Sequence, residues 1–277
     1  MGKVFSNTEN ILTIDDFGSK FEQIDSNKSF YVSSSLCPDK LDSHIYRYVD
    51  FAYLVKMIKE RMFFVPNRQK FSDLREHSEL HFHSIKELRC MRAVPSRRMK
   101  KTVKITQDRY SQIWNQAVSC WTYDAHRENY NGEKINENYL MWKCHSNKHF
   151  VCRIQSTIRR FAHSMRDLSH DIIVSGIEYL PIERYRTADD PLGIFVKPSF
   201  YVDEEEIRFV VLHNELADCS MSKDIKLQFE PLDMIDEILL SPFIDREEER
   251  ILRERLISVL GETEMEIKSS MLMEFSE

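Results

Sequence analysis

The chain has few glycines, and the glycine-rich patterns that hold nucleotide phosphates are missing. Only 6 glycines occur among its 277 residues, and neither G-x-G-x-x-G nor G-x-x-x-x-G-K-[ST] is found. Such patterns let the backbone approach a phosphate closely at the start of a helix. Their absence argues against a Rossmann or P-loop nucleotide site.

Long apolar runs and closely paired cysteines are also missing. No stretch approaches the roughly 18 apolar residues of a membrane-spanning helix, and the N-terminus lacks the apolar core of a signal peptide. The 6 cysteines are scattered without a C-x-x-C. We therefore expect a cytoplasmic protein with reduced thiols and no membrane association.

The balance of charge gives no overall attraction for nucleic acid. The formal net charge is −6, and hydrophobic residues make up 42% of the chain, enough for a packed core. The one strongly basic segment is 86–104, which has no interleaved aromatic residues to stack on bases. This segment is either a phosphate-contacting flap or a solvated insertion.

Three parts of the chain differ in composition. Residues 1–43 form a polar N-terminal extension, either laid over a core or acting as a partner-binding arm. Residues 44–261 alternate strand and helix patterns and predict a single α+β domain. Residues 262–277 are acidic and rich in methionine, and we expect a frayed tail.

Residues 44–65 predict a strand–helix–strand unit. The first strand is His44-Ile-Tyr-Arg-Tyr-Val49, and Asp50 is a good N-cap for a helix with apolar residues at i, i+3, i+4 and i+7. Met62-Phe-Phe-Val65 is the second strand. Arg47 lies near the end of the first strand, where it either meets a ligand or is a surface arginine.

The chain is organised around a late stretch, residues 200–212. Ile207, Phe209 and Val211 fall on one face of an extended segment and Glu206, Arg208 and Val210 on the other, which predicts a strand with one buried face. Glu204, Glu206 and Arg208 share the second face if the strand begins early enough. A carboxylate beside apolar walls can stabilise developing positive charge. The other interpretation is an exposed strand edge, or an Arg–Glu pair on it.

Two clusters invite a metal interpretation. His77, His81 and His83 lie close together, and the segment from Cys144 to Cys152 holds two cysteines and two histidines. Neither spacing fits a familiar zinc site, and the second cluster runs into a strand that places Cys152 in the core. We therefore predict no metal.

Several short motifs follow one another in an order that resembles a known family. The motifs are Tyr46-Arg-Tyr48, Phe71-Ser-Asp73, Ser119-Cys-Trp121, Leu140-Met-Trp142, Glu204-x-Glu206-x-Arg208 and Ile238-Leu-Leu-Ser-Pro242. The ordered set resembles a bacterial family catalogued as domain-of-unknown-function family 2971, over about residues 44–260. Leu74 departs from the family pattern, which has proline there, and so does His145, where the family often has tyrosine.

The same order is similar, more distantly, to the ADP-ribosyltransferases. The resemblance implies a split, mixed β core with flanking helices, NAD as the donor and ADP-ribose as the transferred group. Arg47, Ser119 and Glu206 match the residues of the first, middle and late strands of those enzymes. By the resemblance, Glu206 and Glu204 are catalytic, with Glu206 stabilising the ribose cation and Glu204 contacting or deprotonating the acceptor.

The remaining expected contacts surround the NAD. Arg47 pairs with the pyrophosphate, and Ser119 fixes either the ribose or the glutamate. Arg208 is placed beside the cofactor, or it neutralises Glu206. The rings expected to stack on nicotinamide are Tyr46, Tyr48, Trp121 and Trp142, and the alternative for Trp121 and Trp142 is that they are core aromatics. If Glu205 faces the cleft instead, Glu206 turns inward, which the alternation of residues 207–211 disfavours.

The sequence therefore favours an NAD-dependent ADP-ribosyltransferase acting as an effector or toxin, in a toxin–antitoxin system or in phage defence. The acceptor is nucleic acid, RNA slightly favoured because of segment 86–104, or protein, and a toxin needs an antitoxin partner. The rival interpretation is a non-enzymatic module that binds a ligand or partner, with Glu204, Glu206 and Arg208 as a structural network. A third, a metal-dependent nuclease, uses the histidines at 77, 81 and 83.

Overall fold

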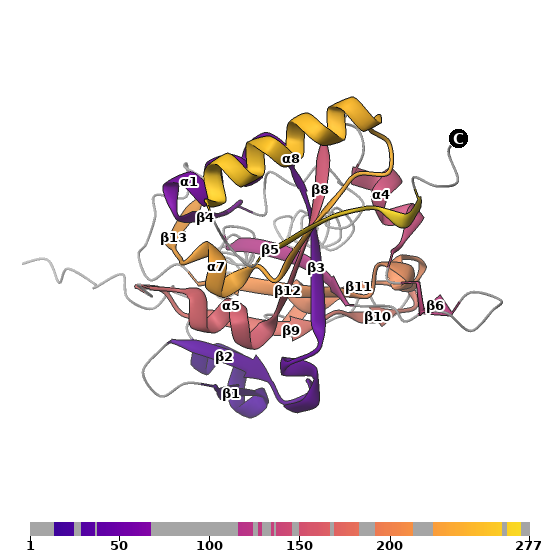
Figure 1. Cartoon of the computed structure of the whole chain (residues 1–277). Helices are drawn as coiled ribbons and strands as arrows, with labels where there is room; N and C mark the ends of the chain where they lie inside the picture. The colour runs from indigo at the N-terminus through magenta and orange to yellow at the C-terminus, as the bar shows by residue number, and fades with distance from the viewer. Residues whose placement is uncertain are drawn as a thin grey trace, which may run out of the picture.

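The computed structural model describes twelve stretches of the chain (Figure 1). They are 14–24, 29–36, 38–67, 116–123, 127–128, 134–135, 137–145, 150–166, 169–182, 192–212, 224–261 and 265–272. The motif Phe71-Ser-Asp73, the histidines His77, His81 and His83, and the basic segment 86–104 lie outside them.

A mixed sheet of nine strands forms the centre of the fold. The strands follow the order β1-β2-β9-β12-β5-β3-β8-β14-β15. In that order they are β1 (Phe21–Gln23), β2 (Phe30–Ser33), β9 (Ile172–Gly176), β12 (Glu206–Val211), β5 (Ala117–Tyr123), β3 (His44–Asp50), β8 (Val151–Thr157), β14 (Glu237–Leu240) and β15 (Glu266–Ser269). The pairs β2–β9 and β14–β15 are parallel and the other pairs are antiparallel. The predicted α+β class, with a mixed sheet and several helices, is confirmed.

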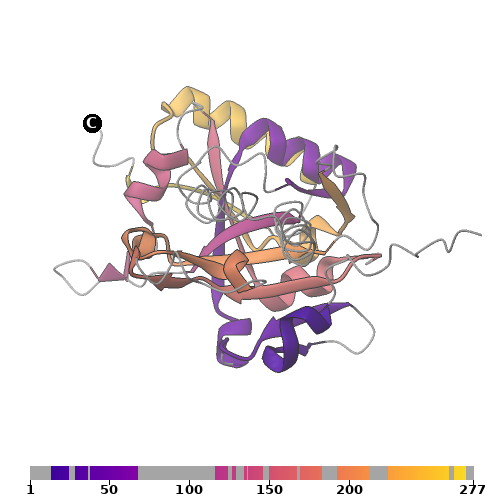
Figure 2. The ribbon, with the colours of Figure 1, turned by 180° about the vertical axis from the view of Figure 1, so that it is seen from behind.

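Helices and short strand pairs surround the sheet (Figures 1 and 2). The α-helices are α1 (Phe51–Glu60), α4 (Tyr139–His145), α5 (Ile158–Ser164), α7 (Pro231–Met234) and α8 (Arg246–Leu260). The 3-10 helices are η2 (Ile14–Lys20), η3 (Pro38–Leu41), η5 (Leu192–Phe195) and η6 (Ser199–Glu204). The short pairs are β10 (Glu178–Leu180) with β11 (Val196–Pro198), β13 (Ile225–Gln228) with β4 (Met62–Val65), and β6 (Arg127–Glu128) with β7 (Lys134–Ile135).

The predicted strand–helix–strand unit is confirmed as β3, α1 and β4. Helix α1 begins at Asp50, whose Oδ1 accepts a hydrogen bond from the Tyr53 N–H at 3.1 Å. Strand β3 pairs with β8 along its whole length but with β5 only through Ile45 and Tyr46. The sheet therefore opens between β3 and β5, and Figures 1 and 2 show β3 and β8 running steeply across the direction of β5 and β12.

Strand β12 is buried on both of its faces. Ile207, Phe209 and Val211 pack into the main core with helix α5, where the rings of Phe209 and Phe161 lie 4.3 Å apart. On the other face Val210 packs into a second apolar cluster that η2 and η5 also supply. The interpretation of residues 206–211 as an exposed edge is wrong, because β9 and β5 flank β12 on its two sides.

Both ends of the domain differ from the sequence prediction. Residues 30–33 pair in parallel with β9, so the described parts of the N-terminal extension complete one side of the sheet. Residues 266–269 pair in parallel with β14, so the tail is not frayed over 265–272. The sequence did not reveal these strands because three or four residues are too few to show a period of two. Hydrogen bonds between backbones hold such short strands in the sheet.

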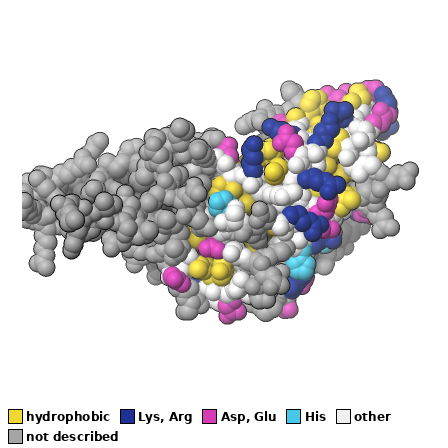
Figure 3. Space-filling view, turned by 90° about the vertical axis from the view of Figure 1, so that its left-hand side faces the viewer, with side chains coloured by type: hydrophobic (Ala, Val, Ile, Leu, Met, Phe, Trp, Pro, Cys, Tyr) yellow, Lys and Arg dark blue, Asp and Glu magenta, His cyan; other side chains and the backbone are white. Residues whose placement is uncertain are grey.

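One side of the molecule carries Lys and Arg beside Asp and Glu (Figure 3). Ion pairs near α5 and α7 join Arg61 to Glu230, Arg160 to Asp236 and Arg166 to Asp233. Each cation lies within 3.1 Å of its acid. These arginines therefore do not form a bare basic surface.

Candidate functional site

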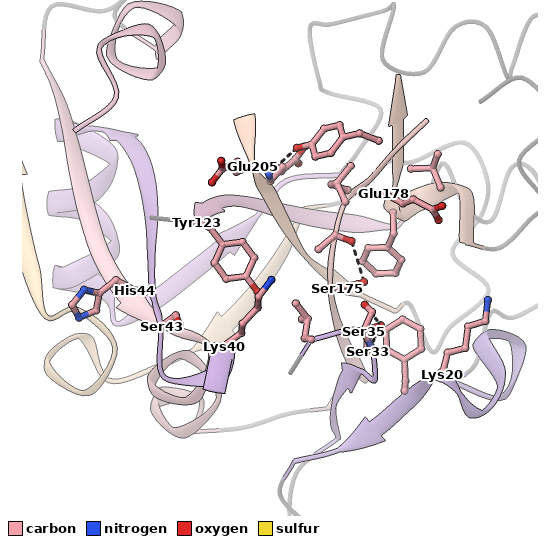
Figure 4. A pocket seen from close by; sticks show the side chains of 18 of the residues that line it. Lys20, Ser33, Ser35, Lys40, Ser43, His44, Tyr123, Ser175, Glu178 and Glu205 are labelled. Atoms are coloured by element: carbon pink, nitrogen blue, oxygen red, sulfur yellow. Dashed lines mark hydrogen bonds between the residues drawn. The ribbon is translucent and has the colours of Figure 1, made fainter. Parts of the chain in front are cut away.

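A cleft of about 880 Å³ lies at the ends of the strands β2, β5, β9, β12 and β3. Figure 4 shows the side chains that line it. The lining residues are Lys20, Phe21, Ser33, Ser35, Leu36, Lys40, Asp42, Ser43, His44, Tyr123, Ser175, Gly176, Ile177, Glu178, Tyr179, Phe195, Val196, Glu205 and Glu206. The cleft has the size of a small-molecule site, and its many hydroxyl and charged groups suit a polar ligand.

The two walls of the cleft come from different parts of the chain. The first wall, residues 20–44, supplies hydroxyl groups together with Lys20, Lys40 and Asp42, and Asp42 is paired with Arg159 at 2.7 Å. Ser33 and Ser35 are linked by a hydrogen bond of 2.8 Å between their Oγ atoms. The second wall, residues 175–206, supplies the carboxylates Glu178, Glu205 and Glu206. The walls thus differ in charge.

The three consecutive glutamates take three different positions. Glu204 ends η6, Glu205 has a left-handed backbone with φ 42° and ψ 48°, and Glu206 begins β12. Glu204 was expected to share the strand face with Glu206 if the strand began early enough, and that condition is not met because β12 begins at Glu206. A lysine from β11 brings them together instead: Lys197 Nζ lies 2.6 Å from both Glu204 Oε2 and Glu206 Oε2.

Glu206 is held by buried cations. Its side chain is 5% exposed, and that of Arg208 is fully buried. Arg208 Nε donates to Glu206 Oε1 at 2.8 Å and Nη2 donates to Oε2 at 3.3 Å, while Nη1 donates to the Ile194 carbonyl at 2.7 Å. Arg208 is thus enclosed by protein, and its positive charge neutralises the Glu206 carboxylate. We call Lys197, Glu204, Glu206 and Arg208 the buried ion network.

Burial and charge shift the titration of this network. Burial raises the pKa of Glu206, and the Lys197 ammonium opposes that shift. Burial alone favours neutral Lys197, but the carboxylates of Glu206 and Glu204 hold its pKa above the ordinary value. Burial also raises the pKa of the neighbouring Cys120 thiol, and the negative charge of Glu206 raises that pKa further. Tyr179, whose hydroxyl accepts the Glu206 N–H at 2.8 Å, has its pKa raised chiefly by burial.

Arg47 and Ser119 lie on the opposite face of the sheet from Glu206. Tyr46, Thr122 and Glu206 are cross-strand neighbours and share one face, so Arg47 points the other way. Arg47 packs with its guanidinium 5.0 Å from the Phe63 ring and lines a separate cleft of about 350 Å³. Three residues that the resemblance unites are therefore not brought together.

Ser119 is enclosed in the core. It is paired with Phe209 across the sheet and accepts a hydrogen bond of 3.0 Å from Trp121 Nε1. Neither Ser119 nor Trp121 has more than 2% of its surface exposed. Both residues therefore serve the packing between β5 and α5, with Trp121 lying 6.0 Å from the Phe161 ring.

The other expected stacking rings are also buried. Tyr48 packs edge-on against Trp142 with ring centroids 4.9 Å apart, and Trp142 Nε1 donates to Glu137 Oε2 at 3.1 Å. Tyr46 lies under the Arg153 guanidinium at 4.2 Å. None of these rings is among the residues that line the large cleft. The aromatic side chains found there are Phe21, Tyr123, Tyr179 and Phe195.

Metal ligands do not gather in the described stretches. No group of three or more His, Cys, Asp or Glu side chains with suitable geometry is found within them. Cys152 is buried in the core and Cys144 is exposed.

No helix among the described residues is long and apolar enough to cross a membrane.

No protein-family model, curated protein or solved structure matches this chain. The site therefore has to be judged from its own geometry. Sequence reasoning missed Lys197, Tyr179 and Tyr123, because lone residues in separate segments carry no local pattern. The acidic run at 203–206 was the one signal that pointed to the cleft.

Proposed function

We propose that the protein binds a small molecule of nucleotide size in the large cleft, and that NAD is the first ligand to test. The observation that carries this proposal is the cleft itself, about 880 Å³ at the strand ends. One wall bears lysines and serines, with Asp42 paired to Arg159, and the other bears Glu178, Glu205 and Glu206. A site of this size and polarity suits a phosphate-containing ligand with a second polar end.

The buried ion network supports a binding function over a catalytic one. Both oxygens of Glu206 are engaged by Arg208 and Lys197 within 3.3 Å. A carboxylate so engaged fixes the start of β12 and the second wall of the cleft. This is the structural role that the rival interpretation gives to Glu204, Glu206 and Arg208.

ADP-ribosyl transfer is the second candidate, and one observation favours it. Glu206, the second glutamate of Glu204-x-Glu206, lines the same cleft. In such a reaction the nicotinamide leaves with the bonding electron pair, an acceptor nucleophile forms the new bond to the ribose carbon, and a carboxylate takes the acceptor's proton. Arg47 and Ser119 take no part in this proposed transfer reaction, because they lie on the face of the sheet opposite Glu206.

The fold, the family and the biological role expected from the sequence are proposed together with the transferase candidate. An ADP-ribosyltransferase-like fold, kinship with domain-of-unknown-function family 2971, and a role in toxin–antitoxin systems or phage defence are proposed with it. The acceptor is then RNA, DNA or protein, and an antitoxin protein restrains the activity. The limited pairing of β3 with β5 supports the split core that this fold requires.

Calorimetry with NAD⁺ and incubation with labelled NAD⁺ and a cell extract test both candidates. Wild type is compared with Lys40→Met, in the cleft, and with Lys59→Met on the outer side of α1 as the matched control. We expect NAD⁺ to bind wild type and the control and to bind Lys40→Met more weakly. Binding without label transfer identifies a binding module.

Label transfer identifies the transferase and names its acceptor. A folded Glu206→Gln variant that still binds NAD⁺ but no longer transfers label assigns the reaction to that carboxylate. Equal binding by wild type and Lys40→Met contradicts the placement of the ligand in this cleft. No binding and no transfer by wild type rules out NAD.

A further inference from the structure

Glu205 has a backbone conformation that does not suit a glutamate. Its φ of 42° lies in the left-handed region, which glycine adopts freely and which residues with a Cβ adopt at a cost. It ends η6, and its N–H donates to the Val202 carbonyl at 3.2 Å. Helix ends of this kind usually carry glycine or asparagine.

The surrounding bonds hold Glu205 in this conformation. Its carbonyl accepts the Tyr123 N–H at 3.0 Å, and the preceding carbonyl, of Glu204, accepts from Thr122 Oγ1 at 2.6 Å. On the other side, the Glu206 N–H donates to Tyr179 at 2.8 Å. The peptide groups are therefore fixed on both sides, and the exposed side chain is kept at the cleft.

The cations of the buried ion network pair with the neighbours of Glu205 and not with its own carboxylate. Lys197 pairs with Glu204 and Glu206, and Arg208 pairs with Glu206. Within the twelve described stretches no ion pair reaches Glu205. Of the three consecutive glutamates, it is the one for which the described residues provide no ion-pair partner.

Tyr123 lines the same cleft as Glu205 and is its neighbour through the backbone (Figure 4). The ring already attracts a cation, since Lys40 Nζ lies 5.3 Å from its centroid. An aromatic ring and a carboxylate together are the usual surroundings of a bound organic cation.

We propose that Glu205, with Tyr123, is the specificity-determining carboxylate of the cleft and selects a ligand that carries a cationic group. This deepens the proposed function and rests on it only in placing the ligand in the same cleft. The ligand cation takes the place of Lys40 at the ring. Lys40 then turns to the anionic part of the ligand, beside the serines of the first wall.

A matched pair of small probes tests this proposal on the full chain. The probes are 1-methylpyridinium, a cation, and pyridine, which is neutral at pH 8. Binding is followed by NMR through the ring signals of Tyr123. We expect the cation to bind more tightly than pyridine, and Glu205→Gln to bind it roughly fivefold more weakly, because the charge attraction is lost. Glu254→Gln, on α8, is the matched control and leaves the affinity unchanged.

Glu205→Gly separates a ligand-binding role from a structural one. If the residue is kept for its carboxylate, glycine relieves the backbone, the urea midpoint stays or rises, and the cation affinity falls as it does in Glu205→Gln. A lower urea midpoint for Glu205→Gly contradicts the proposal. Equal binding of the cation by wild type and Glu205→Gln, or no shift at Tyr123 in wild type, also overturns it.

The outcomes separate this inference from the proposed function. Binding of 1-methylpyridinium that depends on Glu205, with no binding of NAD⁺, keeps the cation site and removes NAD as the ligand. Binding of NAD⁺ that depends on Lys40 but not on Glu205 keeps the ligand cleft and removes the cation site.

Discussion

The substitution Glu206→Gln tests whether the buried ion network stabilises the fold. Glu206 supplies acceptors to two buried cations, at 2.8 Å from Arg208 and 2.6 Å from Lys197. After the substitution, Lys197 keeps its ion pair with Glu204, at 2.6 Å, while Arg208 loses the carboxylate that accepts its two hydrogen bonds from Nε and Nη2. Glutamine keeps one oxygen that can accept a hydrogen bond but carries no charge.

The expected loss of stability is large. Removing one partner of a buried ion pair typically costs about 3–5 kcal/mol, because a buried charge is left uncompensated. The retained amide oxygen places this change near the lower end, about 3 kcal/mol. A typical domain is stable by about 5–15 kcal/mol in total. Glu206→Gln should therefore unfold at a much lower urea concentration, with an unchanged slope of free energy against urea.

Urea unfolding followed by circular dichroism measures this difference. Glu254→Gln is the control, because its partner Arg250 lies at 2.6 Å but both side chains are more than half exposed. Exposed pairs contribute about 0–1 kcal/mol. A loss below about 1 kcal/mol for Glu206→Gln would refute the structural role of the network. The carboxylate would then be free to act on a ligand, which favours the transferase candidate.

Three further predictions follow from buried polar groups. Ser119→Ala should destabilise the protein by about 1–3 kcal/mol in urea, because the Trp121 N–H loses its acceptor in the core; an unchanged midpoint contradicts this. Burial raises the pKa of Cys152 to about 12, so iodoacetamide at pH 8 should label the exposed Cys144 and leave Cys152 unlabelled unless urea is added. The folded state favours the neutral Cys152 thiol, so this contribution to stability is complete below the unfolded pKa and is lost as the pH rises toward 12. Glu137→Ala should speed proteolysis of the C-terminal segment 265–272, because Glu137 accepts hydrogen bonds from it; equal cleavage rates contradict this.

The sequence predicted well wherever a local pattern corresponded to a local structure. The helix at 51–60 has its N-cap at Asp50, as expected. The helix at 246–260 has a capping box between Asp245 and Glu248, a pattern of sequence neighbours, and it ends at Gly261. The alternation of residues 207–211 correctly identified the strand and its core-facing side. In each case neighbours in sequence decide the conformation.

The candidate site was predicted less well, because its contacts join distant segments. Lys197 reaches Glu204 and Glu206 from β11, and no spacing rule connects a lone lysine to them. The left-handed turn at Glu205 moved Glu204 off the strand, and a run of three glutamates contains no sign of such a turn. The face of Arg47 depends on cross-strand register, which a single sequence does not supply.

The strand order also sets how the chain folds while it is being synthesised. Strand β5 leaves the ribosome early, but its neighbour β12 follows more than eighty residues later, and β15 comes near the very end. At ordinary rates of about 5–20 residues per second, one edge of β5 waits roughly 4–16 seconds for its partner. An apolar strand with an open edge is a template for wrong pairing. This edge of β5 should therefore be the place where the growing chain is most open to wrong pairing until β12 emerges.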